Sequence, residues 1–369
     1  MTDPHAISRA PLATSGLLGV FAHPDDETLG AGGLLAAAAA AGVAVDVVTA
    51  TRGERGEVIP PELAHLAGDP QSLAHEREHE VARALEALGV SAHRFLDTEP
   101  GLAARRPARF TDSGMAWVRP GVAGPGSESQ GDAFTAVPVD VAARLLAAII
   151  RRARPQVIVT EEPDGGYGHP DHVHVHQVTM RAVELAADAR PVEDDDDPLT
   201  DLAPWFVPVV GWIVEPEDRY RAALRWLETM VDHDPQFGAR GDVLGTASPD
   251  RELPSLVAPD HLVDLTIDVK PVMAPVLAAL RAHRTQVQSV RTLDRSRPEN
   301  RGLPVCGWLA VSNGVLLPWL GTASLRLAPG RDLVIELTDP RTVDGLTRDR
   351  LAGTQGIDRL AAFLGGSIA

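Results

Sequence analysis

The chain has a single cysteine, Cys306, among its 369 residues. One cysteine excludes an intramolecular disulfide and a thiolate metal cluster, and it is consistent with a reducing compartment. Basic residues are also few, because 34 Lys and Arg face 51 Asp and Glu, a formal net charge of −17. Such an acidic protein does not attract nucleic acid or an anionic membrane surface. We therefore expect a small-molecule substrate, with neither nucleic acid nor membrane as a partner.

Long hydrophobic runs are missing as well. No stretch approaches the ~20 uncharged apolar residues of a membrane span. A secretion signal has a basic segment followed by an apolar one. The opening, MTDPHAISRAPLATS, does not show this pattern. We therefore expect a soluble, cytoplasmic protein. Nothing in the sequence defines its oligomeric state, so a homo-oligomer stays open.

What the sequence does contain is an alternation of strand-like and helix-like segments. Apolar runs at 16–22, 43–51 and 155–162 predict buried strands, and each is followed by a helical pattern. This order is typical of βαβ units, so it predicts an α/β fold with a Rossmann-like, mostly parallel sheet and helices on both faces. The looser pattern after Leu185 predicts a smaller C-terminal portion of strands and helices.

No linker divides the chain convincingly into domains. We expect residues 1–330 to form a single domain and residues 331–369 to be an extension packed on it. The acidic stretch 193–197 is bounded by prolines. Because consecutive acids in a loop repel one another, we interpret it as a solvated surface loop rather than a metal site.

Polar residues gather after two of the predicted strands. The first cluster, HPDDE, begins at His23, where a strand meets a helix. The second, GYGHPDHVHVH, follows the strand at 155–162 and contains four histidines within eight residues. Ligands of parallel sheets bind beyond the carboxyl ends of the strands. Both clusters are therefore expected to open onto one rim of the sheet.

The residue types in the two clusters suit a metal centre. His23 and Asp26, three residues apart at a turn, would form with a third ligand a nitrogen and oxygen site suited to zinc, with a position left for water. Asp25 is then the candidate general base. One of His169 and His172 is the candidate third ligand, and the other a catalytic acid or oxyanion stabiliser. Such a ligand set also suits Fe²⁺.

The paired motifs AHPDDE and GHPDHVHVH resemble the zinc-dependent N-acetylglucosaminyl deacetylase family. The segments TRGERGEVI, RFTDSGMA, AHRTQV and LAVSNGVLLP are similar to one branch of it, which removes acetate from N-acetyl-glucosaminyl-inositol in mycothiol biosynthesis. The resemblance covers roughly residues 16–330. It implies a zinc-dependent hydrolase that converts this N-acetylglucosamine conjugate to the free amine and acetate.

The resemblance also implies roles for individual residues. Asp25 would be the general base, and His169, as an imidazolium, would stabilise the oxyanion. Asp171 would hold and tune His169, and Tyr167 would hydrogen-bond to the polarised carbonyl. The implied zinc ligands are His23, Asp26 and His172. The implied substrate-binding residues are Arg77, Asp112, Met115 and Gln286.

Other functions share part of this pattern. An amidase of mycothiol S-conjugates and a deacetylase of a natural-product sugar are alternatives, because Gly30 and Ala31 offer no polar side chain where the mycothiol branch tends to have one. A silent sugar-binding homologue would be expected to have lost the base or the oxyanion histidine, yet Asp25 and His169 are both present. A dinucleotide-binding oxidoreductase is disfavoured, because LGAGG lacks the GxGxxG spacing.

Overall fold

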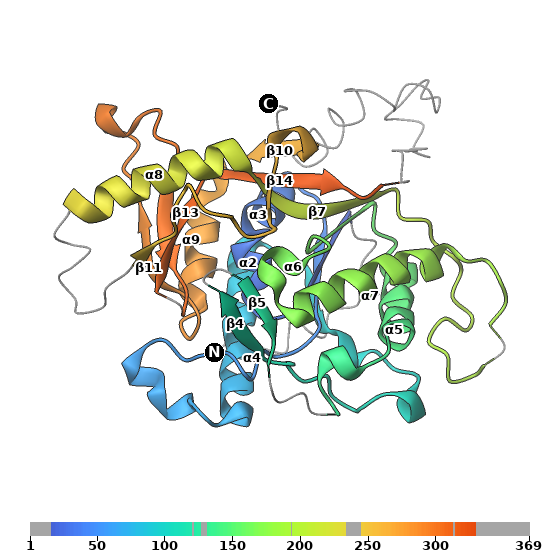
Figure 1. Ribbon diagram of the computed structural model, residues 1–369. Coiled ribbons are helices and arrows are strands. Elements are labelled where there is room, and N and C mark those ends of the chain that lie inside the picture. Colours follow the sequence, from blue (N-terminus) through green and yellow to red (C-terminus); the bar gives the residue numbers. More distant parts are fainter. Residues whose placement is uncertain are drawn as a thin grey trace, which may run out of the picture.

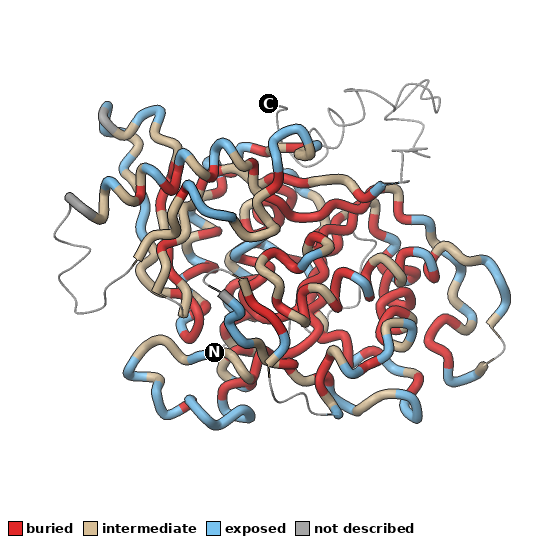
Figure 2. Tube along the Cα trace, in the orientation of Figure 1, coloured by how far each residue is buried: buried red, intermediate tan, exposed pale blue. Residues whose placement is uncertain are grey.

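The computed structural model describes residues 16–329 apart from 120–121, 127–130, 193, 234–244 and 313. In this part of the chain a large sheet carries helices on both faces (Figure 1). The buried residues concentrate in the sheet and on the inner sides of these helices, and exposed residues lie mainly in the outer loops (Figure 2). The predicted fold class is confirmed. The expected extension, 331–369, lies outside the described residues.

The main sheet contains eight strands, seven of them in one hydrogen-bonded order. Their bounds are β1 Leu17–Phe21, β2 Val45–Thr49, β3 Ala92–Phe95, β6 Val157–Thr160, β7 Val209–Pro216, β9 Val257–Ala258, β10 Leu265–Asp268 and β14 Thr322–Leu327. The order is β10-β14-β7-β6-β1-β2-β3, with β9 paired to the end of β7. Strands β7, β6, β1, β2 and β3 run parallel, whereas β14 and β10 add to the edge antiparallel. Parallel strands covered on both faces explain the continuous apolar runs in the sequence.

Two layers of helices cover the sheet. The helices are α2 Asp26–Leu29, α3 Gly32–Ala40, α4 Pro70–Leu88, α5 Val139–Ala153, α6 Gly165–Gly168, α7 Pro170–Ala187, α8 Glu217–His233 and α9 Met273–Ala282. One apolar core joins α3, α4 and α9 to the sheet, and another joins α5 and α7 to its opposite face. Helix α4 ends at Leu88, because Gly89 adopts the left-handed conformation that terminates a helix, with φ 78°.

Smaller elements complete the fold. A second sheet has the order β11-β12-β13-β8, with bounds β11 Gln288–Thr292, β12 Gly307–Ala310, β13 Val315–Trp319 and β8 Gly245–Thr246. A hairpin of β4 Met115–Arg119 and β5 Val122–Pro125 lies between β3 and α5, where no strand was predicted. Short 3₁₀ helices span Pro61–Leu66, Leu96–Thr98, Ala103–Arg105, Phe134–Ala136, Asp260–Leu262, Lys270–Val272 and Pro298–Asn300.

Two features of this arrangement matter for the site. The hairpin packs against α6 so closely that a Cβ atom at Gly168 would lie 2.7 Å from the carbonyl oxygen of Ala123. Strands β1 and β6 are direct neighbours, with Val20 opposite Thr160. The turn after β1 therefore lies beside the segment that leads from β6 into α7.

The helices in the described part of the chain include none with the length and hydrophobicity of a membrane span.

Candidate active site

The two polar clusters meet at the carboxyl ends of β1 and β6, as predicted. His23 follows β1 by two residues, and the turn containing it leads into α2. His169 precedes α7, where its Nδ1 atom accepts a hydrogen bond of 3.2 Å from the amide of Asp171. Pro170 occupies the first turn of α7, where its missing N–H costs nothing. The side chain of His172, one residue beyond Asp171, is thereby directed from α7 towards His23.

The side chains of His23, Asp26 and His172 approach one another in pairs, and all three residues are buried. Nδ1 of His23 lies 3.3 Å from Oδ2 of Asp26. Nε2 of His172 lies 3.3 Å both from Nδ1 of His23 and from Oδ1 of Asp26. Tetrahedral bonds of about 2.0–2.1 Å would separate ligand atoms by about 3.3–3.4 Å. The residues present therefore fit a divalent metal ion.

Other residues of the same cluster also bring ligand atoms within 4.8 Å of one another. These groups are His23 with His169 and His172, His23 with Asp112 and Asp171, and Asp26 with Glu161 and His172. In the group of His23, Asp26 and His172 each pair of side chains has one contact of 3.3 Å, with Oδ2 of Asp26 near His23 and Oδ1 near His172. One ring nitrogen of His169 is already occupied by a backbone amide. This favours His172 over His169 as the third ligand, and the assignment stays a prediction.

Asp171 contacts His23 rather than His169 through its carboxylate. Its Oδ2 atom lies 3.1 Å from Nε2 of His23 and accepts a hydrogen bond of 2.9 Å from the amide of Ser113. A proton held on Nε2 by this carboxylate leaves the lone pair of Nδ1 free for a metal. The resemblance implies that Asp171 holds His169. In the structure the backbone amide of Asp171 donates a hydrogen bond to His169, whereas its carboxylate contacts His23. The carboxylate orients His23, because α7 places it under that ring.

Glu161 is a site residue that sequence analysis missed. It follows β6 directly, and its Oε2 atom lies 3.9 Å from Nδ1 of His172. That nitrogen has no hydrogen-bond partner among the described residues. Burial raises the pKa of Glu161 to about 7. Against the effect of burial, the Asp26 carboxylate raises the pKa of His172 to about 9. The signal in the sequence was an acid at the carboxyl end of a strand that carries the site.

Asp25 adopts an unusual backbone conformation, with φ 127° and ψ −30°. Residues with a side chain rarely adopt such angles, and holding one there costs about 1–3 kcal/mol. Its Oδ2 atom lies 3.2 Å from Nη2 of Arg77. Burial raises the pKa of Asp25 to about 6, although Arg77 opposes the shift. A carboxyl group with this pKa is ionised at neutral pH and can both accept and return a proton.

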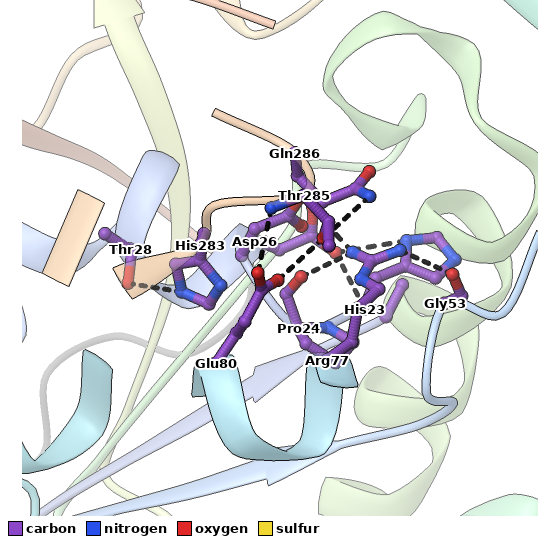
Figure 3. Close-up of polar contacts among 12 residues, drawn as sticks. His23, Pro24, Asp26, Thr28, Gly53, Arg77, Glu80, His283, Thr285 and Gln286 are labelled. Atoms are coloured by element: carbon purple, nitrogen blue, oxygen red, sulfur yellow. Dashed lines mark hydrogen bonds and ion pairs between the residues drawn. The ribbon is translucent and has the colours of Figure 1, made fainter. Parts of the chain in front are cut away.

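Arg77 is buried, with 3% of its surface exposed. Its guanidinium donates hydrogen bonds of 2.6 Å to the carbonyl oxygen of Gly53 and 2.5 Å to that of Pro24 (Figure 3). With the carboxylate of Asp25, these oxygens hold the guanidinium against the turn after β1. Arg77 thus ties α4 to the candidate base. Its implied role in gripping substrate stays a prediction.

His169 and Tyr167 lie over the ligand group. The ring of His169 is 4.6 Å from that of His23, and the ring of Tyr167 is 5.1 Å from that of His172, centroid to centroid. Burial lowers the pKa of His169 well below its usual value, and burial raises that of Tyr167. Each side chain has an N–H or O–H group that can donate a hydrogen bond, and the imidazolium that the resemblance implies for His169 stays a prediction. Because Nδ1 of His169 accepts a bond from the Asp171 amide, its proton resides on Nε2.

The other implied substrate-binding residues lie on three different segments. Asp112 is close to the ligands, with Oδ1 3.7 Å from Nε2 of His23. Met115 begins β4, in the hairpin that packs on α6. Gln286 follows α9 and donates a hydrogen bond of 2.8 Å to the carbonyl oxygen of Glu57. Trp117, missed in the sequence, is 40% exposed and its ring lies 6.0 Å from that of Tyr167. Substrate contacts of these residues stay predictions.

Known proteins share this sequence pattern. Residues 18–183 match the family model PIG-L, described as GlcNAc-PI de-N-acetylase. A 1D-myo-inositol 2-acetamido-2-deoxy-alpha-D-glucopyranoside deacetylase from Kineococcus radiotolerans is 45% identical over 315 residues, which cover 85% of this chain and 77% of that protein. The protein of the same name from Streptomyces scabiei is 38% identical and is covered over 87% of both chains. Among solved structures, the N,N'-diacetylchitobiose deacetylase from Pyrococcus horikoshii aligns with 17% identity and a TM-score of 0.45. The alignment covers 84% of this chain and 89% of that chain.

The α/β fold carries a group of histidines and aspartates at the rim of its sheet, an arrangement that suits metal-dependent hydrolysis. The relatives narrow the class of enzyme further, because the two named above are deacetylases that match most of this chain. The chain belongs to the PIG-L family, and the resemblance predicted from the two motifs is confirmed.

Proposed function

We propose that this enzyme removes the acetyl group from 1-O-(2-acetamido-2-deoxy-glucopyranosyl)-myo-inositol and releases the free amine and acetate. The observation that carries the hydrolysis is the 3.3 Å spacing of His23, Asp26 and His172, with the Asp25 carboxylate on the same turn. The substrate is supported by relatives of 38–45% identity whose names specify it.

We further propose Zn²⁺ as the metal, held by His23, Asp26 and His172; Fe²⁺ suits the same ligand set. When bound, the ion supplies Lewis acidity, which lowers the pKa of a water molecule and polarises a carbonyl group. The carboxylate of Asp171 fixes the proton on Nε2 of His23, so that the lone pair of Nδ1 would be available to hold the ion.

Asp25 accepts the proton of the attacking water and returns it to the leaving nitrogen. Its pKa of about 6 suits both steps near neutral pH. Arg77, 3.2 Å away, keeps the carboxylate in one orientation. Nε2 of His169 and the hydroxyl of Tyr167 donate hydrogen bonds to the oxyanion that develops on the acetyl carbonyl.

We also propose that residues 1–330 act as one domain. The C-terminal strands β10 and β14 extend the main sheet through β7. The helix α9 packs against α4 and α3 in the same apolar core as the N-terminal strands. A unit that shares a sheet and a core in this way unfolds as a whole.

The substrate is tested by acetate release from the glucosaminyl-inositol conjugate, compared with plain N-acetylglucosamine and with cleavage of a mycothiol S-conjugate at equal enzyme. Metal content is measured on the same sample. We expect kcat/KM for the first substrate to exceed the others by at least about tenfold, about 1.4 kcal/mol in transition-state binding. Equal rates on plain N-acetylglucosamine would refute this substrate, and preferred cleavage of the S-conjugate would favour the amidase instead.

A further inference from the structure

We propose that Glu27 and His283 are positioning residues for the general base: their buried hydrogen bond holds the turn that carries Asp25. This inference rests on the proposed function, because it takes Asp25 as the base. It assigns a role to AHRTQV, a C-terminal segment that the hydrolytic chemistry itself does not require.

Glu27 binds the backbone of Asp25 on one side and His283 on the other. Its Oε2 atom accepts a hydrogen bond of 2.9 Å from the amide of Asp25. Its Oε1 atom lies 2.8 Å from Nε2 of His283, 256 residues away in the sequence, and both side chains are completely buried. The hydroxyl of Thr28 donates to the same Oε1 atom. A carboxylate at a helix start normally faces water, so full burial against a distant histidine indicates a specific partner rather than the helix dipole.

The amide that Glu27 binds belongs to the residue with the unusual backbone. Asp25 has φ 127°, and such a conformation persists only where several contacts determine it. Glu27 holds the amide of Asp25, while Arg77 contacts its carboxylate at 3.2 Å. The base is thus fixed at both its backbone and its side chain, by two different parts of the chain.

His283 is itself anchored to the helix that supplies Arg77. Directly after α9, the amide and the hydroxyl of Thr285 donate hydrogen bonds of 2.8 and 2.7 Å to the carboxylate of Glu80 on α4. Figure 3 shows Thr28 beside His283, the pair of Glu80 and Thr285 next to them, and Arg77 reaching Pro24 and Gly53. The segment after α9 is therefore part of the frame around the candidate base.

The test compares Glu27→Ala, Glu27→Gln and the control Thr285→Val by kcat and KM for acetate release, metal content and thermal midpoint. We expect Glu27→Ala to lower kcat about 100-fold, because a base displaced by about 1 Å costs that much. Its KM should stay within about threefold and its metal content unchanged. Glu27→Gln should stay within about fivefold in kcat, since its amide oxygen still accepts from Asp25. Without the Glu27 carboxylate, which raises the pKa of His283 against the effect of burial, the ring favours its neutral form and can accept from the new amide group.

The control removes the hydrogen bond from the Thr285 hydroxyl to Glu80. The bond from the Thr285 amide to Glu80 remains and still anchors the segment, and Glu27 is not touched. Thr285→Val should lower the thermal midpoint and keep kcat within about threefold. In a double-mutant cycle, Glu27→Ala combined with His283→Ala should lose no more kcat than the larger single change, because both act through one amide.

Several results would overturn the inference. The inference is wrong if Glu27→Ala keeps the wild-type kcat with full metal, or if Glu27→Ala loses the metal. It is also wrong if Thr285→Val lowers kcat as much as Glu27→Ala does. If Glu27→Ala does not fold, Glu27→Gln decides, because a 100-fold loss at full metal would show that the hydrogen bond is not what matters. If the proposed substrate is wrong, the wild-type enzyme itself will fail to hydrolyse it. The variants are then compared on whichever N-acetyl amino sugar the wild type hydrolyses.

Discussion

Replacing Asp25 by Asn removes the proposed base and leaves the rest of the turn almost unchanged. Asn tolerates a positive φ better than Ala does, so the backbone at φ 127° gains little additional strain. The amide of residue 25 can still donate to Glu27. The change therefore isolates the ability of the carboxylate to accept a proton.

The expected loss follows from two effects. General base catalysis contributes typically about 10²–10⁴ in rate, so kcat should fall by about 10³, or about 4 kcal/mol. Asn also deprives Arg77 of its anionic partner at 3.2 Å. Removing one member of a buried ion pair costs up to about 3–5 kcal/mol in stability. Because Arg77 keeps two carbonyl acceptors, we expect a smaller loss, about 1–2 kcal/mol.

The assay measures acetate release, metal content and thermal unfolding on one preparation of Asp25→Asn. A stoichiometric metal with kcat reduced by about 10³ supports the assignment. The reasoning is refuted if the variant retains its rate, or if it loses the metal, because Asp25 would then be a ligand and another group the base.

Three further outcomes can be checked. His172→Ala should abolish stoichiometric metal binding while the circular dichroism spectrum stays that of the folded protein; metal retained at one ion per chain would contradict the ligand set. His169→Ala should lower kcat by about 10²–10³, the effect of losing one oxyanion donor, with the metal retained; loss of the metal would make His169 the ligand instead. Burial raises the pKa of Glu215 from 4.5 to about 8, so the folded protein favours the protonated acid. The contribution of this group to stability is complete below pH 4.5 and is lost as the pH rises through 8. Glu215→Gln should therefore raise Tm by about 2–4 °C at pH 9 but not at pH 4, and equal shifts at both pH values would exclude this cause.

Local sequence was sufficient wherever a single segment controls its own structure. The apolar run at 16–22 predicted the buried strand β1, and glycine at position 89 suits the left-handed conformation that ends α4. The hairpin of β4 and β5 escaped prediction, because its strands are short and lie in a segment rich in turns. Its pairing depends on contact with α6 rather than on its own periodicity.

The candidate site divides in the same way. His23, Asp25 and Asp26 share one turn, and His169 and His172 share one helix start, so their residue types and spacing already indicated a metal and a base. The partner of Asp171 did not follow from spacing, because whether its carboxylate reaches His169 or His23 depends on how α7 lies against β1.

The sequence by itself determined the α/β alternation and the kind of chemistry, since both depend on residues that are close along the chain. Only the tertiary structure decided that Glu27 meets His283, that Arg77 faces Asp25 and that Glu161 lies near His172. These contacts join residues separated by as many as 256 positions. Their existence depends on how helices pack on the sheet, which no local pattern encodes.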